Sequence, residues 1–332
     1  MSKTEKDVAR ELASAFSKDE LVPTTQTAEW SMSFKSQNGE DEFGTLKRIF
    51  GLSESARSLF SAVVGNAQSK ILTLHSSALL AFLCFNDVAN HPITIDKIDK
   101  TVYDEVMFEV KNGVITASNP SNVDVLLMGE NRKKLLFLES KFTEYLTGGK
   151  VDLSLDKYGQ FYELLKEKLP FEVSPDTKEH KPDKTHKEPY TVEKIRLSTG
   201  KKTTDHLDGI KQAFSHLLGL ATGPASVQAQ GNEAYDQSLL DNASEIKFAS
   251  IVFNCNHEKF EKYNALYKSV FENSDAIKEA ITEVLNKREL NVAIVPQLLQ
   301  YQEVFQHNYL SDKVRAFYQT VSDSEIGFLT VK

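Results

Sequence analysis

Two acids and a lysine lie near the ends of two short apolar segments. Asp124 interrupts the segment Val123–Met128, and Glu139 and Lys141 close the segment Leu135–Phe142. An acid in such a segment is costly unless it is paired, binds a metal or lies at the mouth of a strand. Carboxylate oxygens are ligands of hard divalent cations, and a nearby ammonium group can neutralise charge that develops during hydrolysis. These residues favour a metal-dependent hydrolytic site, with a salt bridge at a sheet edge as the alternative.

The turn between the two segments determines whether the acids meet. If the hairpin is centred on Asn131-Arg132, Met128 faces Leu135 and Asp124 faces Glu139. Directly opposed Cβ atoms lie about 4.5–5.5 Å apart. Two like charges at that separation are destabilising unless a positive charge lies between them, and a divalent cation meets that need. A slip of one residue in the register would turn Asp124 to the opposite face of the sheet.

The tripeptide Glu-x-Lys is not specific by itself. The copy that begins at Glu109 is a competitor, because it also lies on an expected strand. Glu139 is favoured by its apolar lead-in and by the opposed acid Asp124, so we expect Lys141 and not Lys111 in the active pair. The chain contains four copies: Glu109–Lys111, Glu139–Lys141, Glu179–Lys181 and Glu245–Lys247.

Hydrophobic periodicity and turn residues indicate the elements that would position these side chains. Their order predicts an α/β fold: a central mixed sheet with an antiparallel β-hairpin core, flanked by helices. Strands are expected at Val106–Val110, Val123–Met128, Leu135–Phe142, Phe248–Asn254, Asn291–Val295 and near Ile326–Val331. Helices are expected as a pair within 53–88, at Tyr158–Leu169, Asp205–Ala221 and His257–Phe271, and as two short helices after Val295.

Two segments differ in composition from the rest of the chain. Residues 1–45 are polar and are expected to form an N-terminal arm with a short helix near Val8–Phe16, ahead of one α/β domain over 46–332. Residues 170–204 contain four prolines, and eight Lys or Arg residues against four acids lie between Lys178 and Lys202. We expect an exposed basic loop or insertion there, either a solvated surface or a contact with nucleic-acid phosphates. The candidate phosphate contacts are Lys181, Lys184, Lys187, Lys201 and Lys202.

The composition of the chain restricts the classes of protein to which it can belong. With 332 residues, 40% of them apolar and 26% charged, the chain has an ordinary globular composition. The net charge of −8 argues against non-specific DNA binding but leaves room for a local basic patch. Cys84 and Cys255 lie far apart in apolar runs, and no secretory signal or membrane-length apolar stretch is present, so we expect a cytoplasmic protein with buried thiols. Serine-hydrolase, phosphate-loop, dinucleotide-binding and zinc-protease motifs are absent from the sequence.

The residues around the two acids resemble the PD-(D/E)XK nuclease superfamily. Its signature is similar to Asn122-Val123-Asp124 followed, after fourteen residues, by Glu139-Ser140-Lys141, with Val123 in the place of the signature's proline. Other segments resemble one subgroup, the restriction endonuclease-like proteins of bacteria. They are Glu139–Tyr145 and Gly209–Gln212 followed by His216–Gly219, and the resemblance covers roughly residues 50–255.

The resemblance implies a restriction-endonuclease-like fold and a Mg²⁺-dependent endonuclease that hydrolyses phosphodiester bonds in DNA, with Mn²⁺ as a substitute metal. Asp124, Glu139 and the backbone carbonyl of Ser140 would hold the metal. Lys141 would position the attacking water or neutralise developing charge.

Further site residues are implied by the same resemblance. A glutamine or lysine on a helix after the third strand often lines sites of this kind, and here it would be Gln212. An acid often precedes the motif aspartate, which suggests Glu109 as a further metal ligand, with Glu105 as the alternative.

A rival hypothesis is a non-catalytic interaction or structural protein that retains a nuclease-like sheet. The acidic net charge and the lack of a recognisable DNA-binding module favour it. Geometry separates the two: an open cleft in which Asp124, Glu139 and Lys141 converge supports a nuclease, whereas Lys141 ion-paired at a covered edge supports the rival. The sequence does not distinguish DNA from RNA. It also leaves homodimer formation and a role in restriction or defence open.

Overall fold

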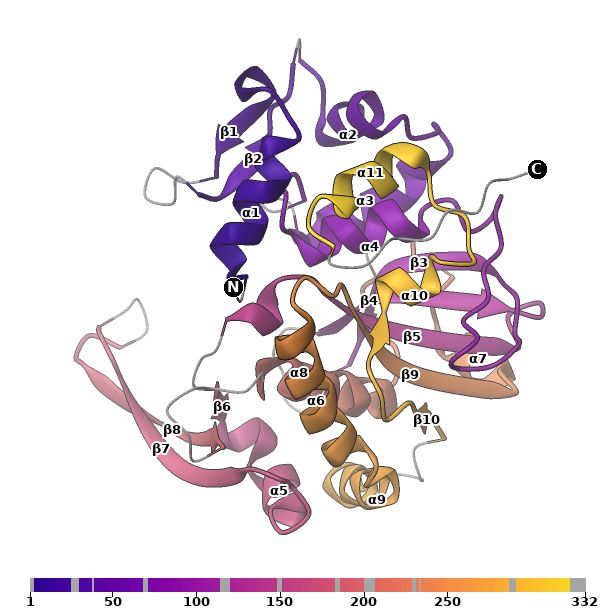
Figure 1. Cartoon of the computed structure of the whole chain (residues 1–332). Coiled ribbons are helices and arrows are strands. Elements are labelled where there is room, and N and C mark those ends of the chain that lie inside the picture. The colour runs from indigo at the N-terminus through magenta and orange to yellow at the C-terminus, as the bar shows by residue number, and fades with distance from the viewer. Residues whose placement is uncertain are drawn as a thin grey trace.

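Within the residues that the structure describes, a six-stranded mixed sheet lies at the centre (Figure 1). The computed structural model describes residues 3–24, 30–37, 39–67, 71–113, 120–147, 151–182, 186–199, 207–228, 231–232, 234–286 and 291–322, without the side chains of 64–67. The strands run in the order β10-β9-β5-β4-β3, and β11 also pairs with β9. Their bounds are β3 Tyr103–Asn112, β4 Ser121–Gly129, β5 Lys134–Lys141, β9 Glu245–Val252, β10 Ala293–Ile294 and β11 Leu299–Gln300.

The sheet combines two antiparallel hairpins with a parallel half. β3, β4 and β5 pair antiparallel in chain order, as expected from the turn residues between them. β5 then pairs parallel with β9, which requires a long crossover through residues 142–244. β5 therefore has a strand on each side and is buried from Leu135 to Lys141, which explains its nearly continuous apolar sequence.

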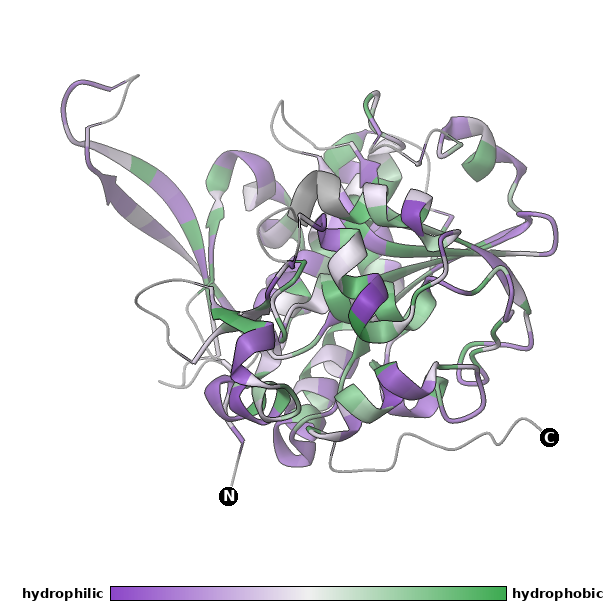
Figure 2. Ribbon diagram, turned by 90° about the horizontal axis from the view of Figure 1, so that it is seen from above, coloured by the Kyte–Doolittle hydropathy of each residue, from purple (hydrophilic) through white to green (hydrophobic). Residues whose placement is uncertain are grey.

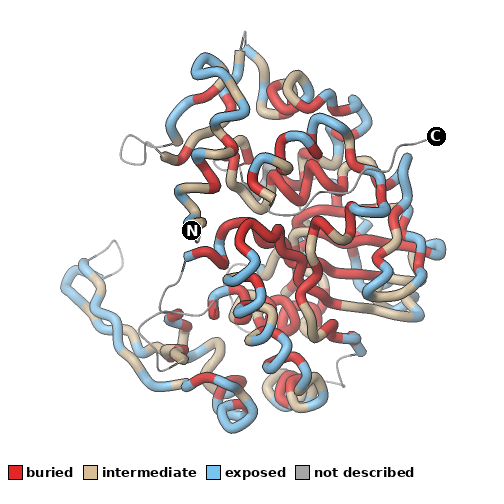
Figure 3. The backbone as a smooth tube through the Cα atoms, viewed as in Figure 1, coloured by how far each residue is buried: buried red, intermediate tan, exposed pale blue. Residues whose placement is uncertain are grey.

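Helices cover both faces of the sheet, and the sheet is the most deeply buried part of the molecule (Figure 3). On one face, Phe82 packs against Phe108 with ring centroids 5.6 Å apart. On the other, the Tyr267 hydroxyl lies 3.0 Å from Ser250 Oγ. The first face is covered by α3 Ala56–Ala67, α4 Ser77–Phe85 and α10 Tyr301–Val304, and the second by α6 Leu207–Thr222 and α8 His257–Phe271.

The N-terminal segment packs on the core through apolar side chains that its polar composition conceals. Val8 and Leu12, on one side of α1 Glu5–Ser14, are fully buried. Phe16 and Phe34 lie 5.0 Å apart, and Phe16 lies 5.5 Å from Phe317 of α11 (ring centroids). The expected polar arm thus joins the hydrophobic core. The other elements here are η1 Lys18–Glu20, β1 Leu21–Pro23, β2 Met32–Phe34, α2 Glu42–Phe50 and α11 Asp312–Gln319.

The proline-containing insertion is a β-hairpin. Of the two expectations for this segment, a loop or an insertion, the loop is therefore wrong. β7 Glu172–His180 and β8 Tyr190–Ser198 pair antiparallel, and β6 Val151–Ser154 joins the other edge of β8. Pro175 is tolerated because β7 is an edge strand. Buried Ile195 and Leu197 anchor β8 beside α5 Leu155–Leu165. Figure 2 shows the mostly hydrophilic hairpin projecting from the body of the protein.

The observed architecture confirms a mixed α/β fold with a mixed sheet and flanking helices. Most predicted elements lie within a few residues of their observed positions, and helix His257–Phe271 has the predicted bounds. The sequence analysis missed three helices, α2, α7 Gln237–Asn242 and α9 Ser274–Leu285. It also missed the short strands β1, β2, β6 and β11. The strand expected near Ile326–Val331 lies outside the described residues.

Candidate active site at the fork between β4 and β5

The predicted register of the β4–β5 hairpin is confirmed. Met128 faces Leu135, and the last paired positions are Val125 and Leu138. The next two residues, Asp124 and Glu139, stand where this backbone pairing ends, so the strands form a fork at that point. One-residue slippage, which would have separated the two acids, is excluded by this register.

Asp124 bridges the fork with its side chain. Its Oδ2 accepts a hydrogen bond of 2.6 Å from the backbone N–H of Ser140 on β5. The N–H and C=O of one residue in an extended strand point to the same side. The carbonyl of Ser140 therefore also faces β4, toward the strand that carries Asp124. The Ser140 side chain faces the other way, where its hydroxyl lies 2.8 Å from the Tyr301 hydroxyl.

The backbone ladder on the other side of Asp124 is also interrupted. β3 and β4 pair at Phe108–Val125 and again at Val110–Val123, so that Glu109 stands opposite Asp124 without being a paired position. Glu109 is buried and has φ of +52°. A non-glycine residue in the left-handed region inside a strand carries backbone strain, which often accompanies functional sites.

Glu139 lies in a buried cluster of charged and polar side chains. One oxygen of Glu139 contacts the Lys141 ammonium, and the other lies 2.7 Å from Nε2 of His216 on α6. The side chains of Glu139 and Lys141 are only 4% and 6% exposed. Ser121, at the start of β4, has its hydroxyl 2.6 Å from Nδ1 of His216. His216 therefore links the start of β4 to the end of β5.

The close approach of α6 to β4 requires a glycine. A Cβ atom on Gly219, nearly one turn after His216, would lie 2.9 Å from Cβ of Ser121 and 3.1 Å from Cβ of Asn112. A larger residue would push the helix away from the sheet. Gly219 therefore allows His216 to reach both Ser121 and Glu139.

The fork affects the two acids in opposite directions. Burial and the nearby Glu139 carboxylate raise the pKa of Asp124 well above its ordinary value, and Glu109 adds to this effect. Burial also disfavours the charged form of Glu139. There, however, His216 and Lys141 outweigh the burial and hold the pKa of Glu139 well below its ordinary value. For Lys141, burial acts to lower the pKa, but the Glu139 charge prevails and raises it.

The donors at the fork fit a divalent cation by their chemistry. Mg²⁺ prefers oxygen ligands, which the carboxylates of Asp124 and Glu139 and the carbonyl of Ser140 supply. A buried carboxylate crowded by other acids is stabilised by a cation. Among the described residues, no group of three or more His, Cys, Asp or Glu side chains is placed to hold a metal ion. The metal-ligand role expected for Glu109 stays a prediction.

The other residues expected from the sequence lie in different places. Gln212 lies one helical turn before His216 on α6, and it is His216 that contacts Glu139. Glu105 pairs with Arg132 beside the β4–β5 turn, at the opposite end of the sheet from Asp124. Lys111 is half-buried, with its backbone N–H donating to Gln228.

The expected phosphate-contacting lysines are only partly described. Lys181 and Lys187 are exposed near the tip of the β7–β8 hairpin. Lys184, Lys201 and Lys202 lie outside the described residues. The hairpin itself carries paired charges lower on its stem, where Arg196 of β8 contacts Asp176 of β7 and Asp152 of β6.

Sequence analysis missed two members of the site, His216 and Ser121. A signal for His216 was present: it lies four residues after Gln212, so both project from the same side of one helix. The sequence places His216 beside Gln212 on the helix but does not identify the partner of the histidine. Ser121 gave no signal, because a serine at the start of a strand is common.

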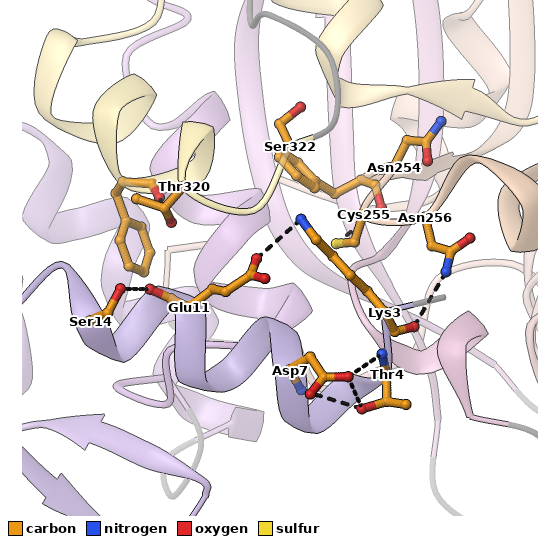
Figure 4. Close-up of polar contacts among 12 residues, drawn as sticks. Lys3, Thr4, Asp7, Glu11, Ser14, Asn254, Cys255, Asn256, Thr320 and Ser322 are labelled. Atoms are coloured by element: carbon orange, nitrogen blue, oxygen red, sulfur yellow. Dashed lines mark hydrogen bonds and ion pairs between the residues drawn. The ribbon is translucent and has the colours of Figure 1, made fainter. Parts of the chain in front are cut away.

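The N-terminal helix lies near the carboxyl ends of β5 and β9. Figure 4 shows the start of α1 beside Asn254, Cys255 and Asn256. The backbone carbonyl of Lys3 accepts a hydrogen bond of 3.4 Å from Nδ2 of Asn256, and the Lys3 ammonium lies 3.1 Å from Glu11. Cys255 is fully buried, as expected for a core thiol.

Comparison of this chain with protein-family models, with curated proteins and with solved structures found no match. Within the part of the chain that the structure describes, no helix has the length and apolar character needed to cross a membrane.

Proposed function

We propose that this protein is a metal-dependent nuclease that hydrolyses phosphodiester bonds in DNA, with RNA as the other substrate to be tested. The observation that carries the proposal is the fork: Asp124 and Glu139 stand at the first unpaired position of two adjacent strands, and Asp124 accepts the N–H of Ser140. Lys141 contacts Glu139 directly. The resemblance of these residues to the PD-(D/E)XK signature supports the same assignment.

Each residue at the fork has a distinct part in the proposed reaction. A bound Mg²⁺ would lower the pKa of a water ligand and offset charge on the phosphate. Asp124, Glu139 and the Ser140 carbonyl are the groups that would hold it. The Lys141 ammonium stabilises negative charge on the attacked phosphate or holds the attacking water. His216 acts through Glu139, whose second oxygen it orients, and is therefore a positioning residue.

Glu139 would bind a cation beside the partners that it already has. Its two oxygens contact Lys141 and His216 in this structure, and both ion-pair partners are buried. A carboxylate has about four lone-pair sites, so each oxygen can accept a further contact. A cation at Glu139 would share its negative charge with Lys141 and weaken that ion pair, which would leave the Lys141 ammonium more available to the substrate.

A cleavage assay tests the proposal. The purified protein, with Mg²⁺ or Mn²⁺, is incubated with plasmid, linear and single-stranded DNA and with RNA. We expect the wild type to cleave at least one of these and Glu139→Gln to lose cleavage. Glu245→Gln is the matched control, because Glu245 begins another Glu-x-Lys tripeptide and its carboxylate pairs with Lys134 and Lys247 away from the fork. Absence of metal-dependent cleavage on all four substrates would refute the proposal.

The burial of the Glu139–Lys141 pair favours a second candidate, a non-catalytic interaction or structural protein. With side chains 4% and 6% exposed, these residues form a covered ion pair. Such a pair also serves to fix a buried strand end in a protein without catalysis. For this candidate we expect Glu139→Gln to lower stability and to change no activity, because there is none to lose.

A further inference from the structure

A cavity of about 220 Å³ lies beside the fork. Ser121 and Asn122 line it from the start of β4, Tyr158 from α5, and Gln212, Ser215 and His216 from α6. One water molecule needs only about 10–15 Å³ of such space. The cavity therefore has room for a small organic group.

The cavity contains buried polar groups whose hydrogen-bonding capacity is not met. Within the described part of the chain, Oε1 of Gln212 and Oδ1 of Asn122 are buried and have no hydrogen-bond partner. Exchanging oxygen and nitrogen in either carboxamide would leave a buried N–H in the same place. The hydroxyls nearby are already engaged, Ser121 with His216 at 2.6 Å and Ser215 with Tyr158 at 2.9 Å. A ligand in the cavity with a hydrogen-bonding edge would satisfy the two amides.

The cavity is directly connected to the proposed catalytic residues. His216 lines it and also contacts Glu139 with Nε2. Asn122 lies two residues before Asp124 on β4, so the two side chains project from the same face of the strand. A ligand in the cavity would thus lie alongside both acids.

We propose that this cavity receives one unpaired nucleobase of the nucleic acid whose adjacent phosphodiester lies at the fork. This inference rests on the proposed nuclease function and narrows its substrate to single strands or to duplexes with an extruded base. Carboxamides of Asn and Gln pair well with the donor and acceptor edges of bases. Bases stack on aromatic side chains, and Tyr158 supplies one in this cavity. The free-energy cost of moving a base out of its stack and pair is smallest for a base that is already unpaired.

Equilibrium binding with a fluorescent base tests the cavity without cleavage. The probe is a single-stranded DNA oligonucleotide with one 2-aminopurine, in Ca²⁺ to slow hydrolysis, and a second oligonucleotide has an abasic site at that position. We expect the aminopurine emission to change on binding to the wild type. Gln212→Leu and Asn122→Leu should each bind the intact oligonucleotide about tenfold more weakly, as expected for loss of one hydrogen bond. Both variants should bind the abasic oligonucleotide with the same affinity as the wild type.

Gln306→Leu is the matched control, because Gln306 is exposed and does not line the cavity. The inference is overturned if the wild type binds neither oligonucleotide, if it binds the abasic and intact strands equally, or if both cavity variants bind as the wild type does. A thermal melt of each variant separates loss of binding from loss of folding. Base binding without any cleavage in Mg²⁺ or Mn²⁺ would support the cavity and refute the nuclease proposal, so the two failures are distinguishable.

Discussion

The carboxylate of Asp124 accepts the backbone N–H of Ser140 across the fork between β4 and β5, at 2.6 Å. The Asp124 carboxylate thus accepts a hydrogen bond that a backbone carbonyl of β4 would accept in a continuous ladder. The aspartate thereby holds the two strands together at the point where their ladder ends. Burial raises the pKa of Asp124, and the nearby carboxylates of Glu139 and Glu109 raise it further.

Asp124→Asn should separate the structural role of this residue from its chemical role. Asparagine keeps an oxygen for the Ser140 N–H and removes the repulsion with Glu139. The pKa of Asp124 is higher in the folded protein than its ordinary value of about 4, which applies to the unfolded chain. The wild type therefore loses stability as the pH rises from about 4 toward the pKa of the folded protein. Without metal, we therefore expect the variant to be as stable as the wild type near pH 4 and more stable at pH 7–8, by thermal melts in EDTA.

The same variant should lose metal-dependent behaviour. We expect Ca²⁺ to raise the melting temperature of the wild type, because a ligand that binds only the folded state stabilises it. Asp124→Asn should show little of this increase and no cleavage with Mg²⁺. If instead the variant is less stable than the wild type without metal, and Ca²⁺ has no effect on either, Asp124 is a structural acid.

Lys141, and not Lys111, is expected to serve the reaction. Lys141→Ala should lower cleavage about 100-fold or more, the range for loss of one group that stabilises a transition-state charge. Lys111→Ala should keep wild-type cleavage, because the Lys111 segment lies on β3 and Lys141 contacts Glu139. Initial rates on the best substrate from the cleavage assay decide between them. The opposite ranking would place the site on β3.

His216 should contribute to stability as well as to the geometry of the site. Its removal leaves a buried oxygen of Glu139 without its partner, so His216→Ala should lower the free energy of unfolding by about 1–3 kcal/mol. Urea unfolding measures this change. His91→Ala is the control, because His91 forms an exposed pair with Asp87, worth at most about 1 kcal/mol. Equal effects of the two substitutions would show that the Glu139 contact is not important for folding.

The tip of the β7–β8 hairpin is expected to contact nucleic-acid phosphates. The triple variant of Lys181, Lys184 and Lys187 to Ala, of which Lys184 lies outside the described residues, should weaken binding to all sequences similarly. It should also reduce the dependence of affinity on salt, because fewer counterions are released. Fluorescence anisotropy at several salt concentrations measures both. A triple alanine variant at the exposed lysines Lys262, Lys268 and Lys313 is the control. An unchanged salt slope in the hairpin variant would mean that the hairpin tip is only a solvated surface.

The strands that form the fork could be predicted from the sequence for a clear physical reason. β4 and β5 are short apolar segments separated by polar turn residues, and the centre of the turn determines which residues face each other. The hydrophobic pattern and the turn are therefore enough to bring Asp124 and Glu139 together. The contact of His216 with Glu139 could not be predicted, because the sequence pattern shows which side of α6 is polar but not where α6 crosses the sheet.

The β7–β8 hairpin was missed for a different reason. Residues 170–204 are rich in proline and lysine, which indicates a loop. The alternation of Ile195 and Leu197 with charged residues in β8 is short, and β7 is exposed along most of its length. The pairing of the two strands supplies the stabilisation that local sequence does not show.

The contact of Phe16 and Phe34 with Phe317 has a consequence for synthesis on the ribosome. Because translation proceeds from the N-terminal side, Phe16 and Phe34 remain without this partner until Phe317 has been translated. At about 5–20 residues per second, the interval is roughly 15–60 seconds. Nascent chains that stop before α11 should expose these rings, bind chaperones and aggregate when released.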